Sequence, residues 1–264
     1  MGVWLGPRGK PRYKMPPIFE YNGVRCDGKA YMSVDGVFTY RVQTAEDGTV
    51  NWELAIYSGN RTNLRFSRVV DQIDAFYVGP GAKGQSGYAG GADGKTAYGG
   101  RGGAGGETKA VSGISVSSGV DYPITIGTTG TATSAFGNSA ASGGGYTGGT
   151  GSHASNNNPV LGTAGHNGNL SFGGAGIRQH WTAVKFGASG GGGGARSANG
   201  TIAAPRSGGS SNAGSGGAYG NDGGAATLTG SGAGGGGGSF DLAGGYDHPG
   251  GNGASGILII RNAR

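Results

Sequence analysis

Glycine dominates the stretch from Gly79 to Gly256, and this feature limits what the chain can fold into more than any other. The chain has 66 glycines in 264 residues, and most of them lie in this stretch. Glycine has no Cβ and loses more backbone freedom on folding than any other residue, so ordinary side-chain packing cannot order such a segment. The stretch is therefore either disordered or folded by backbones that pack directly against one another.

Two features favour an ordered glycine-rich region. Disordered chains are poor in aromatic residues, whereas this chain has 12 Tyr, 8 Phe and 3 Trp. Strand-like apolar runs also bracket the region, since residues 73–78 precede it and residues 257–260 follow it. Extended helices with three residues per turn have no internal hydrogen bonds, so neighbouring glycine runs must bond one another. We therefore expect packed polyglycine-II-like helices with display loops at their ends.

The first 72 residues predict short β-strands. Asn22-Gly23 follows the apolar run 18–21 and is a strong hairpin signal, because both residues tolerate positive φ. Residues 50–57 alternate, with Trp52 and Leu54 on one face and Glu53 on the other, which predicts a half-buried strand. No segment has the pattern of an amphipathic helix. We expect an all-β fold with small β-sandwich-like strands and no substantial α-helix.

Two further strands are expected inside the glycine-rich region. Residues 109–116 and 121–127 flank a Ser-Ser-Gly turn, which predicts a hairpin. Pro123 marks its strand as an edge or a bulge, because proline cannot donate to a ladder. Residues 133–137 are expected to add a further short strand.

The chain divides into three regions by composition. Residues 1–17 form a basic, proline-rich arm that proline keeps extended. The arm is either a solvated segment or a docking arm, and we assign it as a docking arm. Residues 18–72 form a small all-β attachment region. Residues 73–264 form the glycine-rich domain, closed by a C-terminal strand at residues 257–261.

Charge and cysteine content exclude several classes of protein. The net charge of +6 is spread thinly and forms no basic run in the glycine-rich part, so no nucleic-acid partner is expected. Cys26 is the only cysteine, which excludes an intramolecular disulfide framework. No secretory signal or membrane-length apolar run is visible. We expect synthesis in a host cytoplasm and no membrane insertion.

Two motifs resemble catalytic or cofactor signatures, and neither has the required context. Residues 79–84 match a dinucleotide-binding glycine pattern, but no helix can follow them to hold a pyrophosphate. Residues 187–191 match a nucleophile elbow without the strand–turn–helix that it needs. The four histidines also lack the tight spacing of metal ligands. We expect no catalytic residue, no cofactor and no metal.

Polar and aromatic inserts between glycine runs are typical of recognition loops. Tyrosine and tryptophan give large contact area at low entropic cost, while Ser, Gly and Asn give adaptable hydrogen bonds. Some of these aromatic side chains could instead only cover the glycine core. The candidate receptor-binding residues are Tyr146, His153, His180, Trp181, Tyr219, Tyr246 and His248.

Four motifs occur together in the chain, at residues 73–79, 122–127, 134–137 and 256–262. In these motifs the chain resembles the glycine-rich domain of bacteriophage tail proteins, including receptor-binding adhesins at fibre tips. The resemblance covers roughly residues 50–264, and Pro80 and Lys83 depart from the nearly uninterrupted glycine that the family shows at the first glycine helix. It implies location in the virion, at the phage tail, and binding to the host surface.

The resemblance also implies partners. These are a bacterial surface receptor, either a glycan or an outer surface protein, and other tail or baseplate proteins bound through the N-terminal region. The oligomeric state stays open, and a homotrimer is one assembly compatible with it. Two alternatives remain: a purely structural tail component that caps or spaces an assembly, and a depolymerase, which would need paired carboxylates or an activated nucleophile.

Overall fold

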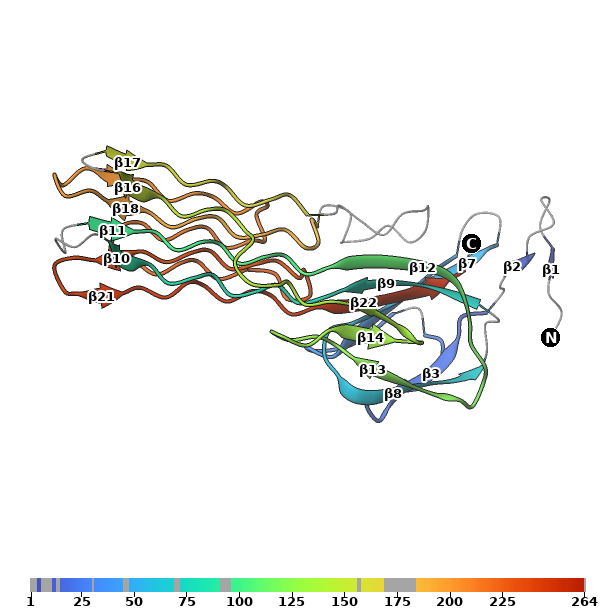
Figure 1. Ribbon diagram of the computed structural model, residues 1–264. Helices are drawn as coiled ribbons and strands as arrows, with labels where there is room; N and C mark the ends of the chain where they lie inside the picture. Colours follow the sequence, from blue (N-terminus) through green and yellow to red (C-terminus); the bar gives the residue numbers. More distant parts are fainter. Residues whose placement is uncertain are drawn as a thin grey trace.

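The computed structural model describes residues 4–5, 11–12, 15–29, 31–44, 48–68, 72–90, 96–155, 158–168 and 184–263. Within these residues the fold is all-β and contains no helix. A β-sandwich forms one end of an elongated molecule, and a bundle of extended segments projects from it (Figure 1). We call the end of the bundle farthest from the sandwich the distal end.

Two six-stranded antiparallel sheets form the sandwich. The first has the order β12-β9-β22-β7-β6-β5, with bounds Thr108–Ser115, Gln72–Val78, Ile257–Asn262, Val50–Ile56, Phe38–Thr44 and Tyr31–Val34. The second has the order β15-β14-β13-β8-β3-β4, with bounds Asn138–Ala140, Thr133–Ala135, Asp121–Thr125, Asn60–Arg68, Ile18–Tyr21 and Val24–Cys26.

Short strand pairs complete the element list. One pair lies near the start of the chain: β1, Trp4–Leu5, and β2, Pro11–Arg12. The others occupy the distal end of the bundle (Figure 1): β10, Tyr88–Gly90; β11, Thr96–Tyr98; β16, His153–Ser155; β17, Asn158–Val160; β18, Ala195–Arg196; β19, Ile202–Ala203; β20, Phe240–Asp241; and β21, Tyr246–Asp247.

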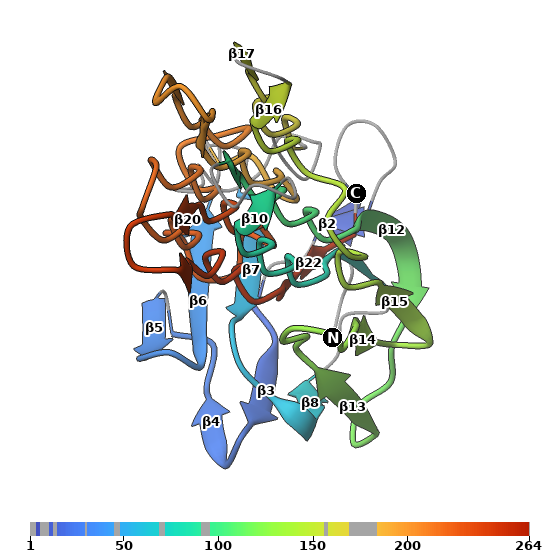
Figure 2. The same cartoon turned by 60° about the vertical axis from the view of Figure 1, so that its left-hand side comes forward.

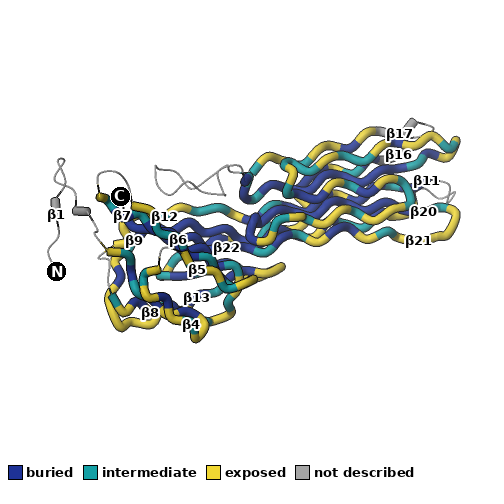
Figure 3. Tube along the Cα trace, turned by 180° about the vertical axis from the view of Figure 1, so that it is seen from behind, coloured by how far each residue is buried: buried dark blue, intermediate teal, exposed yellow. Residues whose placement is uncertain are grey.

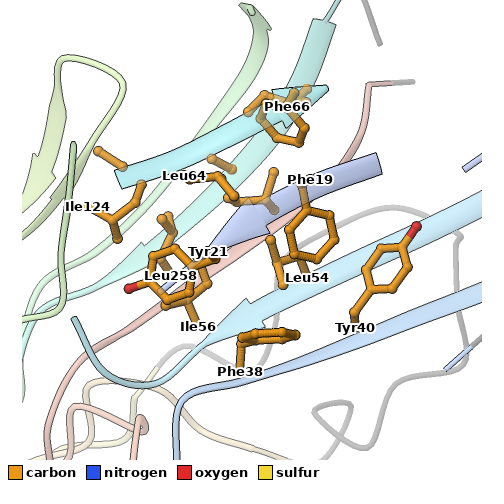
Figure 4. Close-up of a cluster of buried hydrophobic side chains, with 14 of the residues drawn as sticks. Phe19, Tyr21, Phe38, Tyr40, Leu54, Ile56, Leu64, Phe66, Ile124 and Leu258 are labelled. Carbon is orange, nitrogen blue, oxygen red and sulfur yellow. The ribbon is translucent and has the colours of Figure 1, made fainter. Parts of the chain in front are cut away.

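Aromatic and aliphatic side chains fill the space between the two sheets. Strand alternation sends Trp52, Leu54 and Ile56 of β7 into this core, as the sequence predicted. Phe19 of β3 meets the ring of Tyr40 of β6 edge to face, with centroids 5.1 Å apart. Figure 4 shows side chains from both sheets converging on this core, including Phe38, Leu64, Phe66, Ile124 and Leu258.

The central strands of the first sheet, β7, β9 and β22, are also buried on their outer face, which corrects the prediction of a half-buried strand at residues 50–57. Ala55 of β7 is buried there with Phe76 of β9 and Ile259 of β22, and Phe186 packs against them. The rings of Phe76 and Phe186 lie 5.3 Å apart. Because both faces of β22 are covered, the strand can be apolar at consecutive positions, as buried strands commonly are.

Charged residues on the same outer face are paired across neighbouring strands. Arg261 of β22 lies opposite Glu53 of β7 on one side and Asp74 of β9 on the other. The Nε atom of Arg261 is 3.9 Å from Oδ2 of Asp74, and both side chains are buried. Asp74 also accepts a hydrogen bond from the backbone N–H of Gly113, at 3.0 Å. Glu53, expected to point outward from the strand, therefore lies in a buried charge row.

The C-terminal strand forms at the predicted residues, whereas the predicted hairpin of residues 109–116 and 121–127 does not form. Strand β22 pairs with β9 on one side and with β7 on the other, so it is central in its sheet. Strands β12 and β13, predicted to pair, belong to different sheets. The connection crosses the sandwich, with Val116 buried in the core and the N–H of Gly119 bonded to the carbonyl of Phe66. The sandwich thus uses strands from both sides of residue 72, and the expected domain boundary there does not divide it from the bundle.

The extended segments of the bundle are joined by backbone hydrogen bonds that repeat every third residue. Residues 232–239 lie at the centre, and all of them are buried (Figure 3). The N–H groups of Gly234 and Gly237 donate to residues 188 and 191, while those of Gly235 and Gly238 donate to residues 82 and 85. The N–H of Gly236 donates to Gly224. Successive residues therefore face three different neighbouring segments in turn.

The bundle continues three adjacent strands of the first sheet. The chain runs from β9 into residues 79–87, from residues 99–106 into β12, and from residues 248–256 into β22. At the junction the N–H of Gly79 donates to the carbonyl of Glu107, at 2.8 Å. Residue 80 is proline, yet its carbonyl accepts a bond from Gly143, so Pro80 does not interrupt the first segment.

Candidate functional site

The loops at the distal end gather into one surface. Strands β10, β11, β18 and β19 form a four-stranded sheet there. The hairpin β16–β17 contacts β11, β18 and β19, and β20 contacts β11. Figure 2, which brings this end forward, shows β16 and β17 at the top of the view and β10 and β20 below them. We call this the distal surface; it comprises residues 88–98, 153–160, 195–203, 218–222 and 240–248, apart from those outside the described ranges.

Individual turns of the distal surface are held by local hydrogen bonds. In the β18–β19 turn the N–H of Ser197 donates to the carbonyl of Thr201, at 2.9 Å. The side chain of Asn199 accepts a bond from the N–H of Thr201, at 3.0 Å, and Gly200 takes a φ of 89° that glycine favours. Such turns present side chains on a fixed backbone, as binding loops on a rigid scaffold do.

Tyr219 joins three loops of the distal surface. Its ring lies under the guanidinium of Arg196 of β18, with the charge 5.5 Å from the ring centre, which is a cation–π contact. Its hydroxyl accepts bonds from the N–H of Leu242, at 3.1 Å, and from Arg196, at 3.4 Å. Tyr219 is half-buried, so its first role in this arrangement is to fix the positions of neighbouring loops.

Strand β21, which carries Tyr246, lies on the opposite side of the distal surface from β16 and β17 (Figure 1). Tyr246 of β21 is 67% exposed, the highest fraction among the large hydrophobic side chains that the structure describes. His248 places Nδ1 2.9 Å from Oδ1 of Asp222, which belongs to the adjacent turn. The exposed phenol of Tyr246 is thus two residues along the chain from an imidazole that is hydrogen-bonded to a carboxylate.

The other predicted residues do not join this group. Tyr146 is exposed, but it lies toward the sandwich, because Gly143 of the same segment bonds to Pro80 at the junction. His153 begins β16 at the distal end, and nothing is described of its side chain. His180 and Trp181 lie outside the described residues.

The tyrosine pair of the β10–β11 hairpin was not predicted from the sequence. Tyr88 and Tyr98 face each other across the two strands, with ring centroids 5.1 Å apart. Arg196 and the exposed side chain of Ile202 were also missed. A signal existed for the pair, since the two tyrosines flank a segment with three glycines and Asp93.

The described residues contain no group of three or more His, Cys, Asp or Glu side chains placed to hold a metal ion. They also contain no helix that could span a membrane. Comparison of the chain with protein-family models, with curated proteins and with solved structures finds no match.

Proposed function

We propose that the bundle consists of polyglycine-II-type helices, as its composition suggested. The three-residue repeat of the backbone bonds supports this, because three residues per turn characterise that helix. Residues 232–239 exchange backbone bonds with six other segments: residues 79–87, 99–106, 187–194, 214–217, 221–224 and 248–256. Six neighbours around one rod is hexagonal packing, and a side chain at most of these positions would meet a neighbouring backbone.

We further propose that the chain is a receptor-binding adhesin of a bacteriophage tail, which recognises the bacterial host through loops of its glycine-rich domain. One observation carries the proposal: a rigid bundle gathers several loops into one distal surface, remote from the sandwich, with exposed aromatic side chains upon it. Binding interfaces are enriched in tyrosine, tryptophan and arginine, and the distal surface presents Tyr88, Tyr246 and Arg196.

The proposal assigns the two ends of the molecule different roles. The sandwich end, with the basic arm before it, attaches the chain to other tail or baseplate proteins in the virion. The distal end binds the receptor. No catalytic residue, cofactor or metal is assigned.

Binding of the fluorescently labelled protein to a panel of intact bacterial strains tests this function. We expect saturable binding to some strains and a loss of at least about tenfold in affinity for Tyr246→Ala combined with His248→Ala, since a few anchors usually dominate an interface. Tyr31→Ala is the matched control, because Tyr31 is 59% exposed and lies on β5 of the sandwich. A protein that binds no strain, or equal binding by the double variant and the control, would favour a structural cap or spacer.

A further inference from the structure

A groove opens on the side of the bundle, next to the distal surface. Its volume is about 290 Å³, and it lies between residues 85–88, residues 99–101 and residues 150–152. This is close to the lower limit of about 300 Å³ for small-molecule sites. The lining residues are Gln85, Tyr88, Gly99, Arg101, Thr150, Gly151, Ser152 and Leu161.

The apolar part of the groove is preorganised for ligand binding. Tyr88 is 47% exposed, and its ring rests against Tyr98, tilted by 38°. Leu161 is 52% exposed. An aromatic ring fixed by a neighbour loses little freedom when it binds, so the cost of ordering it is already met in the free protein.

The polar part of the groove carries the positive charge of Arg101. Arg101 is exposed, and among the described residues no ion pair involves it. Backbone and side chain of Gln85 bond to the Arg101 backbone: the N–H of Gln85 donates to the carbonyl of Arg101, at 2.8 Å, and Oε1 accepts from its N–H, at 3.4 Å. None of the residues that line the groove is acidic.

The remaining hydroxyl groups complete a polar wall. Thr150 is exposed, and its Oγ1 lies 3.1 Å from Oγ1 of Thr163. Ser152, in contrast, is fully buried, and its hydroxyl is occupied by the N–H of Gly162 and the carbonyl of Ala204. Thr150 and the carboxamide of Gln85 can therefore bond ligand hydroxyls, while Ser152 serves to hold the wall.

We propose that this groove binds a saccharide unit that bears a carboxylate or a phosphate. The ring of Tyr88 and the side chain of Leu161 contact the apolar face of the sugar, and Gln85 and Thr150 bond its hydroxyl groups. The guanidinium of Arg101 takes the anionic group, for which its planar fork of donors is suited. This inference rests on the proposed adhesin function and names a chemical class of receptor for it.

Titration of the ¹⁵N-labelled full-length protein tests the site by the chemical shifts of the Gly99, Arg101 and Gly151 amides. The probes are methyl β-glucuronide, glucose 6-phosphate and, as the neutral reference, methyl β-glucoside. We expect shifts at these amides and at least about tenfold tighter binding of the acidic sugars, because charge-assisted hydrogen bonds are about twice as strong as neutral ones.

Two variants and their controls test the roles assigned to Arg101 and Tyr88. Arg101→Gln should make the acidic and neutral sugars bind equally, and Tyr88→Ala should abolish binding of all three. The controls Arg25→Gln and Tyr31→Ala, at exposed sites on the sandwich, should leave the titrations unchanged. Equal affinity for acidic and neutral sugars in the unmodified protein, or an unchanged preference in Arg101→Gln, overturns the proposal.

The two proposals can fail separately. Labelled protein that binds bacteria but gives no groove shifts with either acidic sugar overturns the saccharide site and leaves the adhesin function standing. Groove shifts that depend on Arg101, in a protein that binds no bacterial strain, support the site and overturn the adhesin function.

Discussion

At the residue scale, Gly236 illustrates why the bundle requires glycine. Its N–H donates to Gly224 and its carbonyl accepts from Gly251, both at 2.8 Å. A Cβ built on it would overlap the backbone carbonyl of Ser215, far inside van der Waals contact distance. A neighbouring backbone cannot move aside as a side chain can, because its own amides are bonded to further segments.

Replacing Gly236 with alanine should therefore destabilise the protein. Overpacking costs about 1–3 kcal/mol, and each backbone group left unbonded by the displacement adds about 1–3 kcal/mol. Thermal unfolding followed by circular dichroism measures the loss. Gly144→Ala is the matched control, since a Cβ there meets nothing within 4 Å. Equal melting temperatures for the two variants would contradict close backbone packing.

Alanine is nevertheless accepted at certain positions of the bundle. Ala188, Ala213 and Ala233 are buried together, and Ala226 packs against them. They form one apolar cluster where segments of the bundle come together. The choice between Gly and Ala thus follows the direction in which each Cβ points, which is set by the three-residue repeat.

Three buried core tyrosines should make the folded state less stable at alkaline pH. Burial raises the pKa of Tyr21 from 10.0 to about 12, and burial also raises the pKa of Tyr40 and Tyr77. Because the folded state holds these protons more tightly, their contribution is complete below pH 10 and is lost as pH rises toward about 12. The urea midpoint should be flat from pH 8 to 9 and fall above pH 10.

The variant Tyr21→Phe tests the contribution of one of these tyrosines to the pH dependence. It removes the hydroxyl that donates to the carbonyl of Ser58, at 2.7 Å, so it should cost about 1 kcal/mol at pH 8. Above pH 10 its stability should fall less steeply than that of the unmodified protein, by up to about 1.4 kcal/mol per pH unit. Parallel curves for the two proteins would show that Tyr21 does not titrate in this range.

At the element scale, β22 connects the sandwich and the bundle. Leu258 points into the sandwich core, is fully buried, and pairs with Ile56 and Tyr77 on either side. Leu258→Ala should cost about 2–5 kcal/mol, through lost burial and the cavity left behind. Chemical unfolding measures this cost, and Leu161→Ala, at a leucine 52% exposed, should cost far less. A loss of under about 1 kcal/mol for Leu258→Ala would contradict a tightly packed core.

The sequence predicts those elements that local rules determine. Asn22 and Gly23 have positive φ and join β3 to β4, as the turn residues indicated. The pairing of β12 and β13 was wrong, because a turn signal shows that the chain reverses but not that the two strands remain in one sheet. Likewise, Glu53 was expected at the surface, since alternation cannot reveal that Phe186, far along the chain, covers that face.

The candidate site was predictable only in part, for a related reason. Tyr219 and Tyr246 could be selected because each stands in a polar insert between glycine runs. That Arg196 lies on Tyr219, or that Arg101 and Leu161 line one groove, depends on which segments are neighbours in the bundle. Nearly identical glycine runs carry no information about their neighbours, so sequence alone cannot supply these contacts.

At the scale of the whole molecule, sandwich and bundle share continuous chain and a common apolar contact. Three adjacent strands of one sheet pass directly into three segments of the bundle. Phe186, which immediately precedes the segment at residues 187–194, packs on Phe76 of β9. Because continuous strands and a shared apolar contact join the sandwich to the bundle, we expect the two parts to unfold together.

Native-state hydrogen exchange tests this cooperativity. The amide of Gly236, central in the bundle, should be strongly protected, and Leu258→Ala in the sandwich should lower its free energy of opening as much as that of the most protected amides of β7. Likewise, Gly236→Ala in the bundle should lower the free energy of opening of the most protected β7 amides as much as that of the bundle amides. Amides that exchange through global unfolding all report the same stability. Leu161→Ala should shift neither set. A Gly236 amide whose protection is unchanged in Leu258→Ala would show that the bundle is an independent folding unit, held to the sandwich by its strands but not stabilised by it.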